Sequence, residues 1–166
     1  TYGNGSAGFD DDLETIPKLK PLNKYGLSKQ MFDMWVIENK LHNKFVGLKY
    51  FNVFGPNENH KGDMRSMVNK AYTQINETSK LKLFRSLKPE YKDGEQMRDF
   101  IYVKDAVEMT LFFDPFNEAG KNETGIYNIG SGTAATWLDA ANAVFKALGK
   151  EPNIEFIDMP ESIMEQ

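Results

Sequence analysis

The chain of 166 residues has a net charge of −4 at neutral pH, and 40% of its residues are hydrophobic. Its 20 Lys and Arg are scattered along the sequence, so no basic patch favours nucleic acid as a partner. No apolar run approaches the roughly 20 residues that span a bilayer. The absence of cysteine excludes disulfides and thiolate metal sites, and two histidines argue against a histidine metal cluster. We therefore expect a cytoplasmic globular protein that binds neither nucleic acid, membrane nor metal.

The first glycine-rich segment reads GNGSAG at residues 3–8 and fits the G-x-G-x-x-G pattern of dinucleotide sites. In such a site the pattern follows a buried strand and opens a helix whose N-terminus faces the phosphates. Here two residues precede it, and three aspartates at residues 10–12 follow it, whose charge would repel a pyrophosphate. We predict a polar loop over residues 3–23. The start without Met favours a fragment whose N-terminal half, with the true glycine fingerprint, is absent.

Hydrophobic periodicity predicts helices alternating with strands along the rest of the chain. A helix beginning near residue 25 has two neighbouring apolar stripes, so two of its faces are expected to be covered; the stripes are Leu27, Met31, Met34 and Trp35, and Tyr25, Lys29, Phe32 and Val36. Further helices are expected over residues 64–75, 106–113 and 136–148, the last with a capping box of Thr136 and Asp139. Strands are expected over residues 45–53, 81–84, 100–103, 125–129 and 154–157, with an exposed loop over 88–96. This alternation predicts a mainly parallel α/β fold.

Two segments carry candidate chemistry. Tyr25 and Lys29 are spaced so that a phenol and an ammonium lie on one helical face. A nearby cation favours a phenolate, which makes such a tyrosine usable as a general acid or base, although the spacing alone also fits a solvated surface pair. Further on, the buried strand ends in KYFNVFGPNENHKG at residues 49–62. This places polar groups at the carboxyl end of a strand, where open α/β sheets bind ligands.

Four motifs in this order resemble the extended short-chain dehydrogenase/reductases, the nucleotide-sugar epimerases and dehydratases. They are Tyr-x-x-x-Lys at residues 25–29, KYFNVFGP at 49–56, RDFIYVKD at 98–105 and YNIGSG at 127–132. The resemblance implies part of a Rossmann-like doubly wound parallel sheet plus a smaller α/β substrate-binding lobe. Residues 1–62 would belong to the cofactor domain and residues 63–166 mainly to the nucleotide-sugar lobe, with about 98–113 returning to the Rossmann domain.

Within this family, the His-Lys-Gly of residues 60–62 is similar to the subgroup of ADP-L-glycero-D-manno-heptose 6-epimerases. The resemblance implies that Tyr25 and Lys61 are the two catalytic acid/base groups. It assigns cofactor contacts to Lys29, Val53 and Lys61. It assigns substrate contacts to Asn52, Asp63, Lys70, Phe84 and Arg98. Arg98 would be the natural partner of a phosphate, although it could instead pair with Asp99 on the surface.

The implied reaction moves hydride from C6 of ADP-glycero-manno-heptose to NADP or NAD, lets the resulting ketone rotate, and returns the hydride to the opposite face. Inversion needs a proton acceptor and donor in both orientations, so Tyr25 and Lys61 are expected to converge on a common cleft. The product would serve lipopolysaccharide inner-core synthesis. The alternatives are another nucleotide-sugar 4-epimerase or 4,6-dehydratase, or a non-catalytic sugar-nucleotide binding fragment. We expect the 166 residues alone to be inactive and the full-length protein to be a homo-oligomer.

Overall fold

The computed structural model describes residues 2, 3 and 5–160, which form two compact units. The first unit comprises Thr1–Tyr50 and Val107–Ile129, and the second comprises Phe51–Ala106 and Gly130–Gln166. Each unit is therefore assembled from two separate stretches of sequence. The α/β class with mainly parallel strands, expected from the sequence, is confirmed in both units.

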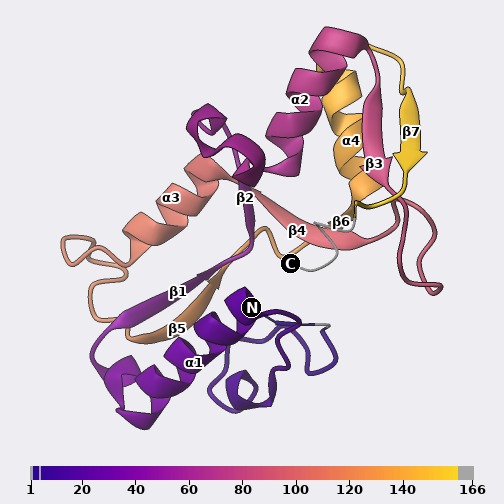
Figure 1. The fold of residues 1–166 in the computed structure, drawn as a ribbon. Helices are drawn as coiled ribbons and strands as arrows, with labels where there is room; N and C mark the ends of the chain where they lie inside the picture. Colours follow the sequence, from indigo (N-terminus) through magenta and orange to yellow (C-terminus); the bar gives the residue numbers. More distant parts are fainter. Residues whose placement is uncertain (1, 4, 161–166) are drawn as a thin grey trace. The chain divides into compact units, whose positions relative to one another are not determined.

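The first unit contains helix α1 (Lys24–Glu38) and a parallel pair of strands, β1 (Val46–Tyr50) and β5 (Gly125–Ile129). Two short 3₁₀ helices complete it, η1 (Ile16–Lys18) and η2 (Leu41–Asn43). Figure 1 shows α1 beside the β1–β5 pair. The helix begins at Asn23, whose side chain accepts a hydrogen bond of 2.8 Å from the Gly26 N–H. Polar capping at this position explains why the helix starts where the apolar periodicity predicts.

The apolar stripes of α1 are largely exposed, which corrects the expectation that two of its faces are covered. Met31 is 63% exposed and Phe32 is 62% exposed. The helix packs mainly against η1 and η2, which are too short to cover two stripes. Its buried side chain is instead polar: Gln30 lies inside and donates a 2.6 Å hydrogen bond to the Ile16 carbonyl.

The glycine-rich segment near the start of the chain is a turn and loop, as the sequence predicts. Gly3, Gly5 and Gly8 all have positive φ angles, and the next helical element is η1, which begins at Ile16. The loop that follows is tied to β5: Asp11 accepts a 2.6 Å hydrogen bond from the backbone N–H of Asn128. The described residues therefore place no helix N-terminus directly after the glycines, which a pyrophosphate site requires.

The second unit contains two small sheets. β2 (Asn52–Phe54) is parallel to β4 (Met97–Tyr102), which pairs antiparallel with β6 (Ala134–Thr136). β3 (Leu81–Phe84) is parallel to β7 (Ile154–Ile157). The helices of this unit are η3 (Asn59–Met64), α2 (Met67–Thr78) and α4 (Trp137–Ala147), while α3 (Val103–Phe112) begins in this unit and continues into the first.

The single strand expected over residues 45–53 is divided at Phe51. β1 pairs with β5 in the first unit, whereas β2 pairs with β4 in the second. The apolar run is continuous in sequence, but its hydrogen-bonding partner changes along its length. A hydrophobic pattern reports burial and not the partner strand, so this division is not visible in the sequence.

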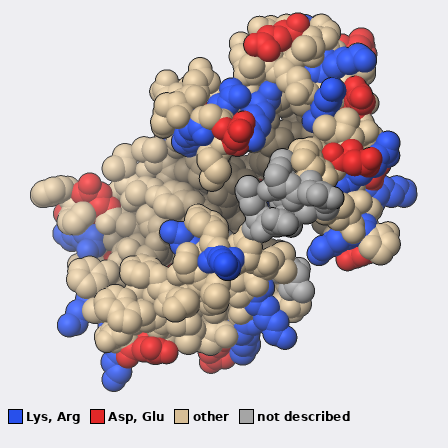
Figure 2. Space-filling view, in the orientation of Figure 1, with Lys and Arg blue, Asp and Glu red and all other residues tan. Residues whose placement is uncertain are grey.

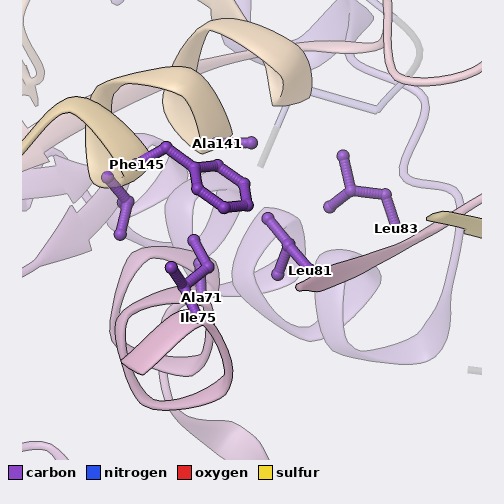
Figure 3. Close-up of a cluster of buried hydrophobic side chains, with 7 residues drawn as sticks. Ala71, Ile75, Leu81, Leu83, Ala141 and Phe145 are labelled. Carbon is purple, nitrogen blue, oxygen red and sulfur yellow. The ribbon is translucent and has the colours of Figure 1, made fainter. Parts of the chain in front are cut away.

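The core of the second unit lies between α2, α4 and β3 (Figure 3). The buried cluster consists of Ala71, Ile75, Leu81, Leu83, Ala141, Val144 and Phe145. In Figure 3 the Phe145 ring of α4 points toward the side chains from α2 and β3. The predicted capping box fixes the start of α4, because Thr136 and Asp139 each accept a hydrogen bond from the other's backbone N–H.

The surface carries charges of both signs. Figure 2 shows acidic and basic side chains interspersed on the face in view, with neither sign forming a continuous area. Within the described residues, no helix combines the length and apolar character that a membrane crossing requires.

Candidate active site

The Tyr25–Lys29 pair lies in the first two turns of α1. The Lys29 Nζ is 5.3 Å from the centroid of the Tyr25 ring, as the four-residue spacing predicts. Both side chains are exposed, Tyr25 by 66%. The ammonium therefore lies beside a phenol that solvent or a ligand can reach. This arrangement suits a general acid or base.

A cavity of about 430 Å³ lies at the end of β2 in the second unit. It brings together three residues that the sequence assigns to cofactor and substrate, namely Asn52, Val53 and Lys61. Its other lining residues come from β4, the loop and η3 after β2, the starts of α2 and α4, and the residue before β2; they are Phe51, Glu58, Met64, Arg65, Ser66, Met67, Phe100 and Trp137. The cavity thus combines apolar and aromatic side chains with about as many polar and charged ones.

The turn after β2 depends on a close approach of the backbone. A Cβ at Gly55 would lie 2.4 Å from Cγ1 of Val103, so a larger residue does not fit there. The chain then turns sharply, with positive φ at Asn57 and at Gly62. Lys61 lies between these turns, and its side chain is 47% exposed. The loop therefore presents an accessible ammonium at the edge of the cavity.

Glu58 is a residue of this site that the sequence analysis did not single out. Its side chain is buried, and it accepts hydrogen bonds from the backbone N–H groups of Gly55 and Ser66 and from the Ser66 hydroxyl. Desolvation opposes its ionisation, but these hydrogen bonds and the nearby Lys61 charge outweigh it and lower the pKa of Glu58 below its ordinary value. The sequence offered one hint of Glu58, namely its position between Pro56 and the His-Lys-Gly segment.

Arg98 lies exposed on β4, and its Nη1 donates a 2.7 Å hydrogen bond to the Met97 carbonyl. The alternative pairing of Arg98 with Asp99 is not observed among the described ion pairs. Asp99 instead accepts hydrogen bonds from the backbone N–H groups of Ser131 and Gly132 and from the Ser131 hydroxyl. This carboxylate therefore joins the third sequence motif, at residues 98–105, to residues 131 and 132 of the fourth.

The remaining predicted substrate residues lie outside the lining of this cavity. Phe84 is the last residue of β3 and is 37% exposed. Asp63 in η3 and Lys70 in α2 are both exposed. Their assigned contacts with a nucleotide stay predictions. Tyr25 and Lys61 belong to different units, and the expected convergence of these two groups also stays a prediction.

Residues 1–130 match the family model described as the NAD dependent epimerase/dehydratase family. This match covers more than half of the chain and includes Tyr25, Lys29, Asn52, Val53 and Lys61. The chain belongs to the NAD dependent epimerase/dehydratase family.

Two curated relatives with high sequence identity to this chain carry the same name. The ADP-L-glycero-D-manno-heptose-6-epimerase of Nitratidesulfovibrio vulgaris (strain DP4) is 53% identical over 163 residues, which is 98% of this chain and 49% of that protein. The protein of the same name from Fusobacterium nucleatum is 46% identical over 172 residues, covering 98% of this chain and 51% of its own length. The chain therefore spans about half the length of the curated relatives it matches.

A solved epimerase of the family has the same fold. The crystal structure of the ADP-L-glycero-D-manno-heptose-6-epimerase of Helicobacter pylori matches with a TM-score of 0.71 and 28% identity. The match covers 95% of this chain and 46% of that one. The structural and sequence comparisons thus agree on the family and on the part of its members that this chain represents.

Proposed function

We propose that the protein is a nucleotide-sugar epimerase that inverts C6 of ADP-glycero-manno-heptose by transient oxidation, in the synthesis of a lipopolysaccharide inner-core precursor. The observation that carries this proposal is the 53% identity to the N. vulgaris protein over 98% of the chain. Because the chain spans about half of that relative, the proposal concerns the complete protein. Its cytoplasmic location and homo-oligomeric state belong to the same proposal.

The nicotinamide end of the cofactor fits residues of this chain. The exposed Lys29 ammonium offers donors for ribose hydroxyls, and Val53 offers an apolar surface in the cavity with Lys61 beside it. The chemistry that NADP, or NAD, supplies when bound is the reversible acceptance of a hydride. The loop at residues 3–8 does not fit the pyrophosphate, since it leads into no helix N-terminus.

The residues of the chain have separate tasks in this proposal. Tyr25 accepts the proton of the C6 hydroxyl as the C6–H bond breaks, with the Lys29 ammonium 5.3 Å from its ring centroid. After the C6 ketone has rotated, Lys61 donates a proton to its oxygen as hydride returns to the opposite face. Proton and hydride are each removed once and restored once, so the substrate changes only in configuration.

The proposed substrate contacts extend this scheme. Asn52 in the cavity would orient the sugar, while Phe84 and Arg98 would contact the ADP group, with the guanidinium paired to a phosphate. Asp63 and Lys70 would supply further polar contacts. In this proposal, residues 1–62 belong to the cofactor domain and residues 63–166 mainly to the substrate lobe. Residues of about 98–113 return to the cofactor domain.

The test is an assay of the chain expressed together with the coding sequence on either side of it. ADP-D-glycero-D-manno-heptose should be converted to its C6 epimer, followed by proton NMR of the sugar. Tyr25→Phe and Lys61→Met should each reduce kcat by about 10²–10⁴-fold, the range of general acid–base catalysis. Cofactor retention should stay largely intact in both variants. The matched controls are Tyr72→Phe, another exposed helical tyrosine, and Lys121→Met.

Three outcomes would contradict parts of the proposal. Turnover of a UDP- or dTDP-hexose in place of the ADP-heptose would favour the alternative of a 4-epimerase or 4,6-dehydratase. A Lys61→Met variant with wild-type activity would remove Lys61 from the mechanism. Measurable epimerisation by the 166 residues alone would refute the assignment of the cofactor phosphates to sequence outside this chain.

A further inference from the structure

Glu58 is a buried carboxylate that has no role in the proposed reaction. It is 5% exposed and lines the same cavity as Lys61. Burying a carboxylate is costly unless its oxygen atoms are fully engaged. The lowered pKa of Glu58 indicates that the group is ionised in the folded protein. A buried, ionised side chain three residues from a candidate catalytic lysine calls for an explanation.

The two carboxylate oxygens of Glu58 contact both ends of the loop that carries Lys61. Oε1 accepts a 3.1 Å hydrogen bond from the Gly55 N–H, directly after β2, and a 2.7 Å bond from the Ser66 hydroxyl. Oε2 accepts a 2.6 Å bond from the Ser66 N–H and lies 3.9 Å from the Lys61 Nζ. One side chain thus connects the end of a strand, the start of a helix and the lysine.

Ser66 transmits this anchoring to the core of the unit. Its hydroxyl caps α2 by accepting a 3.2 Å hydrogen bond from the Asn69 N–H while it donates to Glu58. One and two turns further along α2, Ala71 and Ile75 are fully buried in the hydrophobic cluster. The Glu58 carboxylate is therefore linked through α2 to the hydrophobic core of the unit.

The loop has little else to hold it among the hydrogen bonds of the described residues. Two further bonds are internal, since the Lys61 N–H donates to the Glu58 carbonyl at 2.9 Å and the Arg65 Nε donates to the Gly62 carbonyl at 2.9 Å. One more bond reaches α2 from the end of the loop, from Arg65 Nη1 to Asn69 Oδ1 at 3.3 Å. Gly62 has φ 55°, and its Cβ position meets no atom within 4 Å, so packing does not restrain it. Without Glu58, both flanks of the loop would lose their common anchor.

We propose that Glu58 is a positioning residue that holds Lys61 at the cavity through its bonds to Gly55 and Ser66. This inference rests on the proposed function, in which Lys61 exchanges a proton with the C6 oxygen. A loop anchored for stability alone needs only acceptors for the Gly55 and Ser66 N–H groups, and a neutral amide oxygen can also accept such bonds. The carboxylate instead provides three hydrogen-bond acceptor contacts and an attraction for the lysine.

The experiment uses the full-length protein and compares Glu58→Ala, Glu58→Gln and Ser66→Ala with the wild type. Misplacement of a catalytic group by about 1 Å costs about 100-fold, so kcat should fall by about that factor in Glu58→Ala. KM should change by less than about threefold, because the ground-state substrate contacts remain. Glu58→Gln keeps the shape of the side chain and part of its hydrogen bonding. Its kcat should therefore lie between those of the wild type and Glu58→Ala. When Lys61→Met is already present, adding Glu58→Ala should lower kcat no further.

A matched control is Glu118→Gln. Glu118 pairs with Lys121 three residues later, as Glu58 does with Lys61, but the pair lies on an exposed loop. This variant should have wild-type kcat and KM. Equal kcat in Glu58→Ala and Glu118→Gln would overturn the proposal. So would a fall of kcat in Glu58→Ala that is fully accounted for by the loss of folded protein measured by circular dichroism.

A second measurement does not depend on the substrate. Amide hydrogen exchange over residues 57–65 should accelerate by about tenfold or more in Glu58→Gln and Ser66→Ala, while exchange in α4 stays unchanged. If the wild type fails to epimerise the ADP-heptose, the proposed function fails, but faster exchange confined to this loop still supports the anchoring. Unchanged exchange overturns it. If Glu58→Ala does not fold, Glu58→Gln and Ser66→Ala decide by the same criteria.

Discussion

Truncation of Phe145 to alanine should destabilise the second unit by about 4 kcal/mol. The side chain is 0% exposed and lies in the cluster formed by α2, β3 and α4. Loss of the ring removes roughly 100–150 Å² of buried apolar surface, about 3 kcal/mol, and the residual cavity adds about 1–2 kcal/mol. The cluster has no polar member that would admit water to the space left by the ring.

Urea unfolding would measure this change. Of the two tryptophans, Trp137 packs against the cluster, so its fluorescence in a Trp35→Phe background reports on the second unit. The control is Phe116→Ala, which removes the same ring from a side chain that is 94% exposed and should change stability by less than about 0.5 kcal/mol. A Phe145→Ala variant within about 1 kcal/mol of its parent would refute the assignment of the core.

Three further predictions concern hydrogen bonds and close packing. Burial opposes ionisation of Glu58, but its hydrogen bonds lower its pKa overall. The ionised group therefore stabilises the folded protein above its unfolded pKa of about 4.3. This contribution is lost as the pH falls through the lower pKa of the folded state. The urea-midpoint difference between wild type and Glu58→Gln should therefore shrink from about pH 6 to about pH 3, and a constant difference would contradict this. Thr136→Ala should lower the stability of the second unit by about 1 kcal/mol in thermal unfolding, whereas Thr136→Ser should retain the cap. Gly130→Ala should cost about 1–3 kcal/mol, because the new Cβ would lie 2.7 Å from Asp99 Oδ2 and 2.9 Å from the Phe51 ring, and wild-type unfolding would contradict that packing.

Local patterns in the sequence were sufficient to predict most helices and strands. In β3, Leu81 and Leu83 are buried while the residues between and after them are exposed, which is the alternation that marks a strand. The capping box of Thr136 and Asp139 correctly located the start of α4. β6 was missed because Ala134–Thr136 is three residues long and has no alternation. The exposure of the α1 stripes was missed because periodicity shows which face is apolar but not what covers it.

In the candidate site, too, local patterns predicted residues, whereas contacts between distant parts of the chain could not be predicted. Tyr25 and Lys29 could be paired from sequence because one helix fixes their spacing. The family resemblance supplied Lys61, Asn52 and Val53, which line one cavity. Glu58 could not be predicted, because its role depends on the path of a loop that brings Gly55 and Ser66 to the same carboxylate. No local pattern records that path.

The division of each unit into two stretches limits how the protein can be dissected. The chain changes unit at residues 50–51, 106–107 and 129–130, so no single continuous piece of gene encodes either unit. Ending a clone after Tyr50 would leave β1 without β5, its partner in the sheet. Starting one at Phe51 would still carry residues 107–129 as an unneeded insert. An isolated second unit therefore requires residues 107–129 to be removed and a linker to join residue 106 to residue 130, because truncation at one end cannot separate the two units.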